Sequence, residues 1–310
     1  MSAPDSRALS DWIGAPVRTN EPLARHCSWR VGGPAEYFVE AETIEILRKA
    51  IAAARRAGIP YHVLGRGTNI LIADGGLRGL VITTACDGYT VCEHAATATL
   101  YAEAGGSLPL LANSMSKRGW AGLEWAVGIP SSIGAAVVNN CGAHGTAIAD
   151  IVEQVTILDA EGHERRLKAG ACKFAYRHSR FKGQSQEIVL AAEFRLRREA
   201  PEAVQERLRR HNDYRRATQP SDPSAGSVFK NPAGDFAGRL IDAAGLKGTQ
   251  LGGALISPVH ANFFVNTGTA TAEDLRGLIR LTQVQVEERF GIRLEPEIEF
   301  LGEWDAAQGR

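Results

Sequence analysis

The fold is decided by the stretch Gly128-Ile129-Pro130-Ser131-Ser132-Ile133-Gly134-Ala135-Ala136, which continues to Asn139-Asn140-Cys141-Gly142. In this stretch a tight loop runs into small residues that can form a helix. Amides exposed at a helix start, together with the helix dipole, favour a phosphate group, and Ser131 and Ser132 add hydroxyl donors. The alternative is a closely packed helix whose small residues allow intimate contact. The two interpretations are compatible.

A second glycine-rich segment, Gly65-Arg66-Gly67-Thr68-Asn69, follows a β-rich run. Glycine permits positive φ and lets backbone amides approach an anion closely. A plain strand-to-strand turn explains this segment equally well when it is taken alone. Neither segment has the spacing of a Rossmann fingerprint or of a P-loop, so those two nucleotide-binding folds are excluded.

The composition is that of an ordinary globular protein, with 310 residues, 44% of them hydrophobic, and a formal net charge of zero. Nucleic acid is a poor candidate partner because there is no basic surplus. The five cysteines contain no C-x-x-C pair, which argues against a disulfide framework and a zinc site, so we expect no bound metal and a cytoplasmic location. We find no signal-peptide core in residues 1–11 and no apolar run long enough to span a membrane.

The chain divides into three expected blocks of mixed helix and strand, namely residues 18–84, 85–199 and 200–304. In the first, Thr43 is expected to cap a helix that stops at Gly58, and strands are expected at 61–64, 70–73 and 80–83. The second has expected strands at 100–103, 155–159 and 188–196, and a helix that starts after Ser107. The third opens with a helix at Pro201, continues through a loop at 217–225, and ends with a helix that Thr271 and Asp274 begin.

Several motifs in consistent order resemble those of the UDP-N-acetylenolpyruvoylglucosamine reductases. They are Ser28-Trp29-Arg30-Val31-Gly32-Gly33-Pro34-Ala35, the run Gly65 to Ile72, and the run Gly128 to Gly145. The resemblance covers roughly residues 18–302. It implies an α+β fold with a two-part FAD-binding domain of the vanillyl-alcohol-oxidase (PCMH) type, divided at residue 84, and a C-terminal α+β substrate-binding domain. Ser131, Ala135, Asn139 and Cys141 depart from the family pattern, and we expect them to leave flavin binding intact.

Three further motifs carry the family's catalytic positions onto Arg177, Ser227 and Glu297. They are Tyr176-Arg177-His178-Ser179-Arg180-Phe181-Lys182, Ser224-Ala225-Gly226-Ser227-Val228-Phe229-Lys230-Asn231-Pro232 and Leu294-Glu295-Pro296-Glu297-Ile298-Glu299-Phe300. The implied reaction is reduction of the enolpyruvyl double bond of UDP-N-acetylglucosamine enolpyruvate by NADPH through non-covalent FAD, in peptidoglycan precursor synthesis. Arg177 would stabilise the charge that spreads into the substrate carboxylate, Glu297 would polarise it, and Ser227 would deliver the proton.

The resemblance also implies binding residues. Those for FAD are Arg30, Gly65, Arg66, Gly67, Thr68, Asn69, Gly128, Ile129, Pro130, Ser131, Ser132, Gly134, Asn140 and Gly142. Those for the UDP-sugar are Tyr176, Lys230, Asn231, Asn262 and Asn266. Lys230 could also help to reprotonate Ser227. His260 is expected to pack or to form a hydrogen bond. Arg216, Thr218 and Gln219 are candidate ligands of the nucleotide sugar, since the chain resembles the shorter subtype that lacks an extra tyrosine-bearing loop.

Two other functions remain open from the sequence, an oxidase of the same flavin superfamily and a non-enzymatic sensor of nucleotide sugars. Many such oxidases hold FAD covalently through a histidine in the first phosphate loop, and Gly65 to Asn69 contains none. A sensor would not need Arg177, Ser227 and Glu297 together. We expect a monomer that binds neither nucleic acid nor a membrane.

Overall fold

The computed structural model describes residues 5–183 and 186–304, which form two compact units. The first unit contains residues 5–17, 39–66 and 80–215, and the second contains Arg18–Phe38, Gly67–Gly79 and 216–304. The division passes through two strands, β2 (Pro34–Ala41) and β5 (Leu77–Thr84), so each strand contributes to both units. It also falls within the glycine-rich segment, between Arg66 and Gly67.

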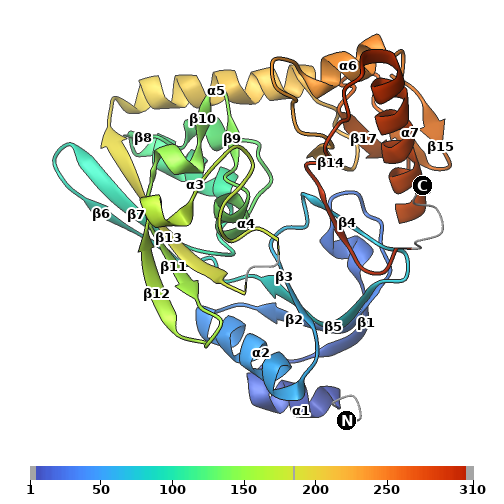
Figure 1. The fold of residues 1–310 in the computed structure, drawn as a ribbon. Helices are drawn as coiled ribbons and strands as arrows, with labels where there is room; N and C mark the ends of the chain where they lie inside the picture. The colour runs from blue at the N-terminus through green and yellow to red at the C-terminus, as the bar shows by residue number, and fades with distance from the viewer. Residues whose placement is uncertain (1–4, 184–185, 305–310) are drawn as a thin grey trace. The chain divides into compact units, whose positions relative to one another are not determined.

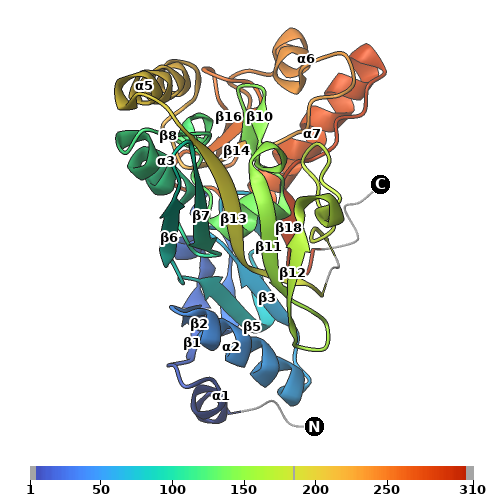
Figure 2. The same ribbon diagram turned by 90° about the vertical axis from the view of Figure 1, so that its left-hand side faces the viewer.

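The first unit is built around a six-stranded sheet whose main order is β12-β11-β13-β7-β6, with β8 beside β13 (Figure 2). All of these neighbours pair antiparallel. The strands are β6 (Tyr89–Glu93), β7 (Thr97–Glu103), β8 (Trp120–Ala121), β11 (Val152–Leu158), β12 (Glu164–Lys168) and β13 (Ile188–Arg198). A parallel pair, β3 (Tyr61–Leu64) with β5, and a small hairpin, β9 (Gly142–Ala143) with β10 (Thr146–Ala147), belong to the same unit.

The helices of the first unit begin and end where their residues favour it. In α2 (Ile44–Ala57) the Thr43 hydroxyl accepts a hydrogen bond from the Ile46 amide, and Gly58 ends the helix with a φ of 66°. The helix expected after Ser107 is α3 (Leu108–Lys117), although the Ser107 hydroxyl makes no capping bond. The other helices are α1 (Ser6–Ile13), α4 (Ile133–Val138) and α5 (Pro201–Thr218), whose residues up to Arg215 belong to this unit.

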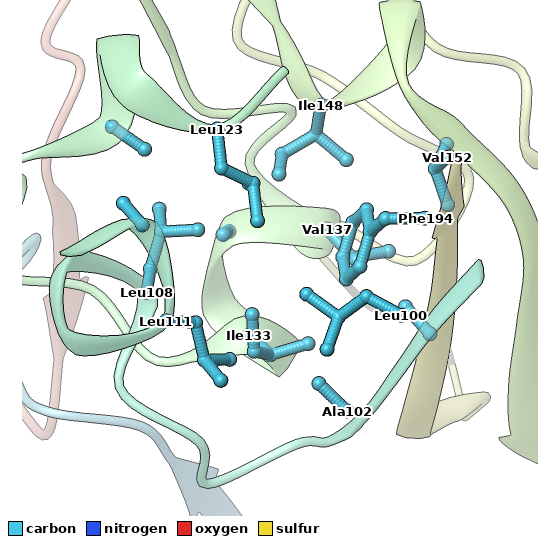
Figure 3. Close-up of a cluster of buried hydrophobic side chains, with 14 of the residues drawn as sticks. Leu100, Ala102, Leu108, Leu111, Leu123, Ile133, Val137, Ile148, Val152 and Phe194 are labelled. Atoms are coloured by element: carbon cyan, nitrogen blue, oxygen red, sulfur yellow. The ribbon is translucent and has the colours of Figure 1, made fainter. Parts of the chain in front are cut away.

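The core of this unit lies where α3 and α4 meet the six-stranded sheet. Figure 3 shows Ile133 and Val137 of α4 beside Leu100 of β7 and Phe194 of β13. Each is fully buried, and burial of a side chain of this size stabilises the fold by about 1.5–3 kcal/mol relative to exposure. The stretch that begins at Gly128 is therefore anchored at its helical end by the core of the first unit.

The second unit contains a four-stranded antiparallel sheet in the order β14-β17-β16-β15, packed against α7 (Figure 1). Its elements are β1 (Arg18–Pro22), β4 (Ile70–Ile72), β14 (Ser224–Ser227), α6 (Ala237–Ala243), β15 (Gln250–Leu251), β16 (Ala254–Ile256), β17 (Phe263–Asn266), α7 (Ala272–Phe290) and β18 (Glu299–Leu301). The capping box predicted for Thr271 and Asp274 is confirmed.

Two pairings bind early segments of the chain to late ones within the second unit. Strand β4 pairs parallel with β18, so that Ile70 faces Glu299. The indole nitrogen of Trp29 donates to the carbonyl of Phe264 at 2.7 Å, and the Asn266 amide donates to the carbonyl of Trp29 at 2.8 Å. Trp29 is fully buried, so the Arg18–Phe38 segment is held firmly against β17.

Candidate active site

The three predicted catalytic residues are divided between the two units. Arg177 lies in the first unit, while Ser227 and Glu297 lie together in the second. The Glu297 amide donates to the carbonyl of Val228, the residue after Ser227, at 2.7 Å. The main chains that carry Ser227 and Glu297 are therefore adjacent within one unit, whereas the convergence of the three catalytic side chains stays a prediction.

Ser227 lies at the end of β14, where the pairing with β17 is irregular. The register shifts between Ser224 and Ser227, and Gly226 has a φ of 75°. Such a bulge changes the direction of the side chains that follow it. Ser227 is half-buried, and none of the residues that the structure describes bonds to its hydroxyl, which leaves that hydroxyl available to a ligand.

Asn262 holds the segment that follows Ser227. Its side-chain oxygen accepts a hydrogen bond from the Phe229 amide at 2.9 Å, and its side-chain nitrogen donates to the Phe229 carbonyl at 2.8 Å. The Val228 amide donates to the Asn262 carbonyl at 2.8 Å. Since Asn262 is only 2% exposed, these contacts give it a structural role, and the substrate contact expected from the sequence stays a prediction.

The side chain of Asn266 also bonds to main-chain groups. Besides its bond to Trp29, its side-chain oxygen accepts hydrogen bonds from the Gly268 and Ala270 amides at 2.8 and 3.0 Å. It is 6% exposed. The contacts therefore point to a structural role for this residue too.

The other residues expected to contact the substrate have different partners. The Asn231 side chain accepts a hydrogen bond from the Ala237 amide at 3.1 Å, at the start of α6. The ammonium of Lys230 pairs with the carboxylate of Glu295, so it is not directed at Ser227. Tyr176 is exposed and lies under the Arg177 guanidinium, 5.3 Å from it. These three side chains stay candidates for substrate contact.

His260 and Val259 lie just before Asn262 in the chain. The His260 ring accepts a hydrogen bond from the Asn262 amide and packs edge-on against Phe263, which confirms the expected packing role. Burial lowers the pKa of His260, so the neutral ring that accepts this bond is favoured. Val259, which stands where the family usually has lysine, is exposed.

Arg177 has an unusual backbone. Its φ is 52°, a left-handed conformation that costs energy in residues other than glycine and often marks a functional site. Its guanidinium donates to the Gly142 carbonyl at 3.1 Å. The side chain of Asn140 donates to the carbonyl of Ala175 at 2.9 Å and accepts from the Ala149 amide at 3.0 Å. The first unit thus brings Arg177 beside Asn140 and Gly142, two residues expected to bind FAD.

The glycine-rich segment from Gly65 to Asn69 fits an anion. Within the described part of the chain, none of its five amides donates a hydrogen bond to another protein group. Gly67 has a φ of 61°, and a Cβ there would lie 1.9 Å from the His26 carbonyl oxygen. A Cβ on Gly65 would lie 2.4 Å from the Ser132 hydroxyl. Only glycine fits at both places, and the unpaired amides suit the diphosphate of FAD.

The helix after Gly128 corrects one part of the sequence interpretation. Its first amides were expected to face a phosphate, but those of Ile133 and Gly134 donate to the carbonyls of Gly106 and Ala104 at 2.9 and 2.8 Å. A Cβ on Gly134 would lie 3.0 Å from Ala104 Cβ. The alternative of a closely packed helix is therefore confirmed. Ser132 is fully buried, and its hydroxyl accepts a bond from the Ala135 amide.

The remaining residues expected to bind FAD lie in loops. Gly128 has a φ of 73°, Ile129 and Pro130 follow it, and the Ser131 hydroxyl donates to the carbonyl of Ser132. Arg66 is exposed. Arg30, with a φ of 57°, lines a cavity of about 690 Å³ in the second unit together with Arg25, Ser28 and Ser224.

Arg215 was not among the site residues predicted from the sequence. A Cβ on Gly128 would lie 3.0 Å from its guanidinium, so this side chain covers the loop, whereas the analysis named Arg216. Burial lowers the pKa of Arg215. No motif in the sequence singles out Arg215, because its contact with Gly128 joins segments that lie far apart in the chain.

Comparison with known proteins identifies the class. A family model described as FAD binding domain matches residues 35–168, and one described as UDP-N-acetylenolpyruvoylglucosamine reductase, C-terminal domain, matches residues 219–301. These two matches define an FAD-dependent oxidoreductase with a separate C-terminal domain. The predicted fold class, with its FAD-binding domain of the vanillyl-alcohol-oxidase type, is confirmed.

Individual relatives give the family. The chain is 44% identical over 287 residues to UDP-N-acetylenolpyruvoylglucosamine reductase 2 of Symbiobacterium thermophilum, an alignment that covers 92% of each protein. The corresponding reductase of Rubrobacter xylanophilus is 43% identical and is covered to 96%. The crystal structure of the Thermus caldophilus reductase superposes with a TM-score of 0.79 at 34% identity, covering 93% of this chain and 99% of that one. The chain belongs to the family of UDP-N-acetylenolpyruvoylglucosamine reductases.

Proposed function

We infer that this chain reduces UDP-N-acetylglucosamine enolpyruvate to UDP-N-acetylmuramate with NADPH, a step of peptidoglycan precursor synthesis. The observation that carries this inference is the identity of 44% to a reductase of that name over 92% of both chains. The segment Gly65 to Asn69 would hold the diphosphate of FAD, which would supply the hydride-transfer chemistry between NADPH and the enolpyruvyl double bond. The protein's own residues bind, orient and exchange protons around that transfer.

We propose that Ser227 donates the proton that completes the reduction. Its half-buried hydroxyl has no partner among the described residues, and the carbonyl of the next residue, Val228, accepts a hydrogen bond from the Glu297 amide, which supports this role. A positioned proton donor contributes about 10²–10⁴-fold to a rate. Lys230 is paired with Glu295, and we propose that solvent water returns the proton to the serine.

Arg177 is proposed to stabilise the substrate carboxylate as negative charge spreads into it, and Glu297, in its protonated form, is proposed to donate a hydrogen bond to the same carboxylate. The planar guanidinium of Arg177 suits a carboxylate, and its bond to Gly142 fixes one of its nitrogens. Glu297 is half-buried, with its main chain fixed by the segment after Ser227. These are the roles that the family motif assigns to both positions.

For the FAD diphosphate we propose the segment Gly65 to Asn69, with its unpaired amides, and the loop Gly128 to Ser132. Arg30, Gly134, Asn140 and Gly142 complete the proposed cofactor contacts, although the Gly134 amide is already bonded to the backbone. The three-part division at residues 84 and 199 also stays a prediction.

The experiment is an anaerobic titration followed by absorbance. We expect a yellow protein that NADPH bleaches and that UDP-N-acetylglucosamine enolpyruvate recolours. Rapid reoxidation by oxygen with peroxide release would instead indicate an oxidase. A colourless protein that still binds the UDP-sugar would indicate a sensor.

We further propose a cytoplasmic monomer. The five cysteines are all free and all lie within the described residues, which suits a reducing compartment. No helix in residues 5–183 or 186–304 has the length and apolarity to cross a membrane. Light scattering after size exclusion tests the monomer, and cell fractionation tests the location.

A further inference from the structure

Three segments of the second unit are hydrogen-bonded side by side around Glu297. They are residues 67–72 with β4, residues 227–230 after β14, and residues 294–301 with β18. Strand β4 pairs with β18, and Phe229 forms an antiparallel bridge with Pro296. The central segment therefore has the glycine-rich segment on one side and the Ser227 segment on the other.

The main chain of Glu297 is held from both sides. Its amide donates to the Val228 carbonyl at 2.7 Å, and its carbonyl accepts a hydrogen bond from the Asn69 side-chain nitrogen at 3.1 Å. The carbonyl of Asn69 in turn accepts a bond from the Glu299 amide at 2.9 Å. The two bonds of Asn69 therefore hold the main chain of Glu297 and of Glu299, the residues on either side of buried Ile298.

We propose that Asn69 is a positioning residue that sets the place of the Glu297 carboxylate, an inference that rests on the proposed function. Asn69 was expected from the sequence to contact the cofactor, and one of the two N–H donors of its side-chain amide is used on the Glu297 carbonyl. A main chain fixed at both its amide and its carbonyl fixes the point and direction from which the Glu297 side chain extends, and small misplacement of a catalytic group costs up to about 10²-fold in rate. The side-chain amide of Asn69 thereby links the glycine-rich segment to the segment that carries Glu297.

The decisive variant is Asn69→Asp, which has the same shape but presents an oxygen to the Glu297 carbonyl. In stopped-flow experiments with FAD-saturated enzyme, we expect flavin reduction by NADPH to slow less than reoxidation does, although the new carboxylate lies in the segment proposed to hold the FAD diphosphate. Reoxidation by UDP-N-acetylglucosamine enolpyruvate should slow by about 10–100-fold. Glu297→Gln is expected to alter one limb of the pH profile of reoxidation. Asn69→Asp should shift or abolish the same limb.

A double-mutant cycle separates this role from a general structural one. If Asn69 acts through Glu297, Asn69→Ala slows reoxidation in the parent but adds less than about twofold in Glu297→Gln. Thr68→Ala is the matched control, because it lies in the same segment without a recorded bond to residues 294–301, and its effect should be the same in both backgrounds. Equal effects of Asn69→Ala in both backgrounds, or loss of FAD affinity with normal reoxidation, would overturn the proposal. Failure of the parent to reoxidise with the enolpyruvate would instead refute the proposed function.

Discussion

Replacing Asn262 by alanine should destabilise the second unit strongly. The side-chain amide pairs with both the amide and the carbonyl of Phe229, at 2.9 and 2.8 Å. Asn262 and Phe229 are 2% and 1% exposed, so water cannot easily replace the lost bonds. Each buried main-chain group left without a partner costs about 1–3 kcal/mol, which gives roughly 2–6 kcal/mol for the pair. That is a large part of the stability of an ordinary domain, about 5–15 kcal/mol.

Urea denaturation followed by tryptophan fluorescence measures this effect as a change in the free energy of unfolding. Asn113→Ala is the matched control, because Asn113 is exposed on α3 and alanine is the better helix former there, so stability should be unchanged or slightly higher. Asn262→Asp retains the acceptor but loses the donor, and its defect should shrink at low pH, where a protonated carboxyl can donate again. A loss below about 1 kcal/mol for Asn262→Ala would refute the reasoning, since the two bonds would then contribute almost nothing.

Three further outcomes are expected. Ser227→Ala should leave flavin reduction by NADPH intact and slow substrate reduction by about 10²–10⁴-fold in stopped-flow experiments, and equal slowing of both half-reactions would contradict its role. Burial raises the pKa of Cys172 to about 11, so a thiol reagent at pH 8 should modify exposed Cys92 quickly and reach Cys172 only after unfolding. The fast phase of the modification should disappear in Cys92→Ser. Burial lowers the pKa of the stacked His144 and His211, so the folded chain binds fewer protons and stability should fall as the pH drops below about 6.5. Thermal unfolding at several pH values checks this, and His211→Phe, which keeps a ring at that place, should reduce the fall.

The sequence predicted helices best where both ends carry capping residues. Thr43 and Gly58 bracket α2, and Thr271 with Asp274 begins α7, whose buried residues Leu275 and Leu278 lie on the predicted face. Local hydrogen bonds decide these ends, so a short window of sequence contains the information. By contrast, β6 (Tyr89–Glu93) was missed, because it is an exposed edge strand without a continuous apolar pattern.

Contacts between distant segments limited the prediction of the site. The motifs placed Ser227 and Glu297 together, yet they did not reveal that Asn262 and Asn266 are consumed by the backbone of Phe229 and Trp29. A polar residue in a motif can serve a ligand or the main chain equally well, and only the partner distinguishes the two. The amides at the start of α4 were misjudged for the same reason, because their acceptors lie some 30 residues earlier, at Ala104 and Gly106.

The pairing of β4 with β18 has a consequence for biosynthesis. Asn69 and Glu297 are 228 residues apart, and the Trp29 indole bonds to a residue 235 positions later. A nascent chain emerges from the ribosome in order, so these early segments must wait, without their final neighbours, until translation is almost finished. Loop closure over such distances is slow. Even a short deletion that removes β18 should therefore damage the opposite end of the polypeptide, and we expect chaperones to bind mainly before the last strand is released.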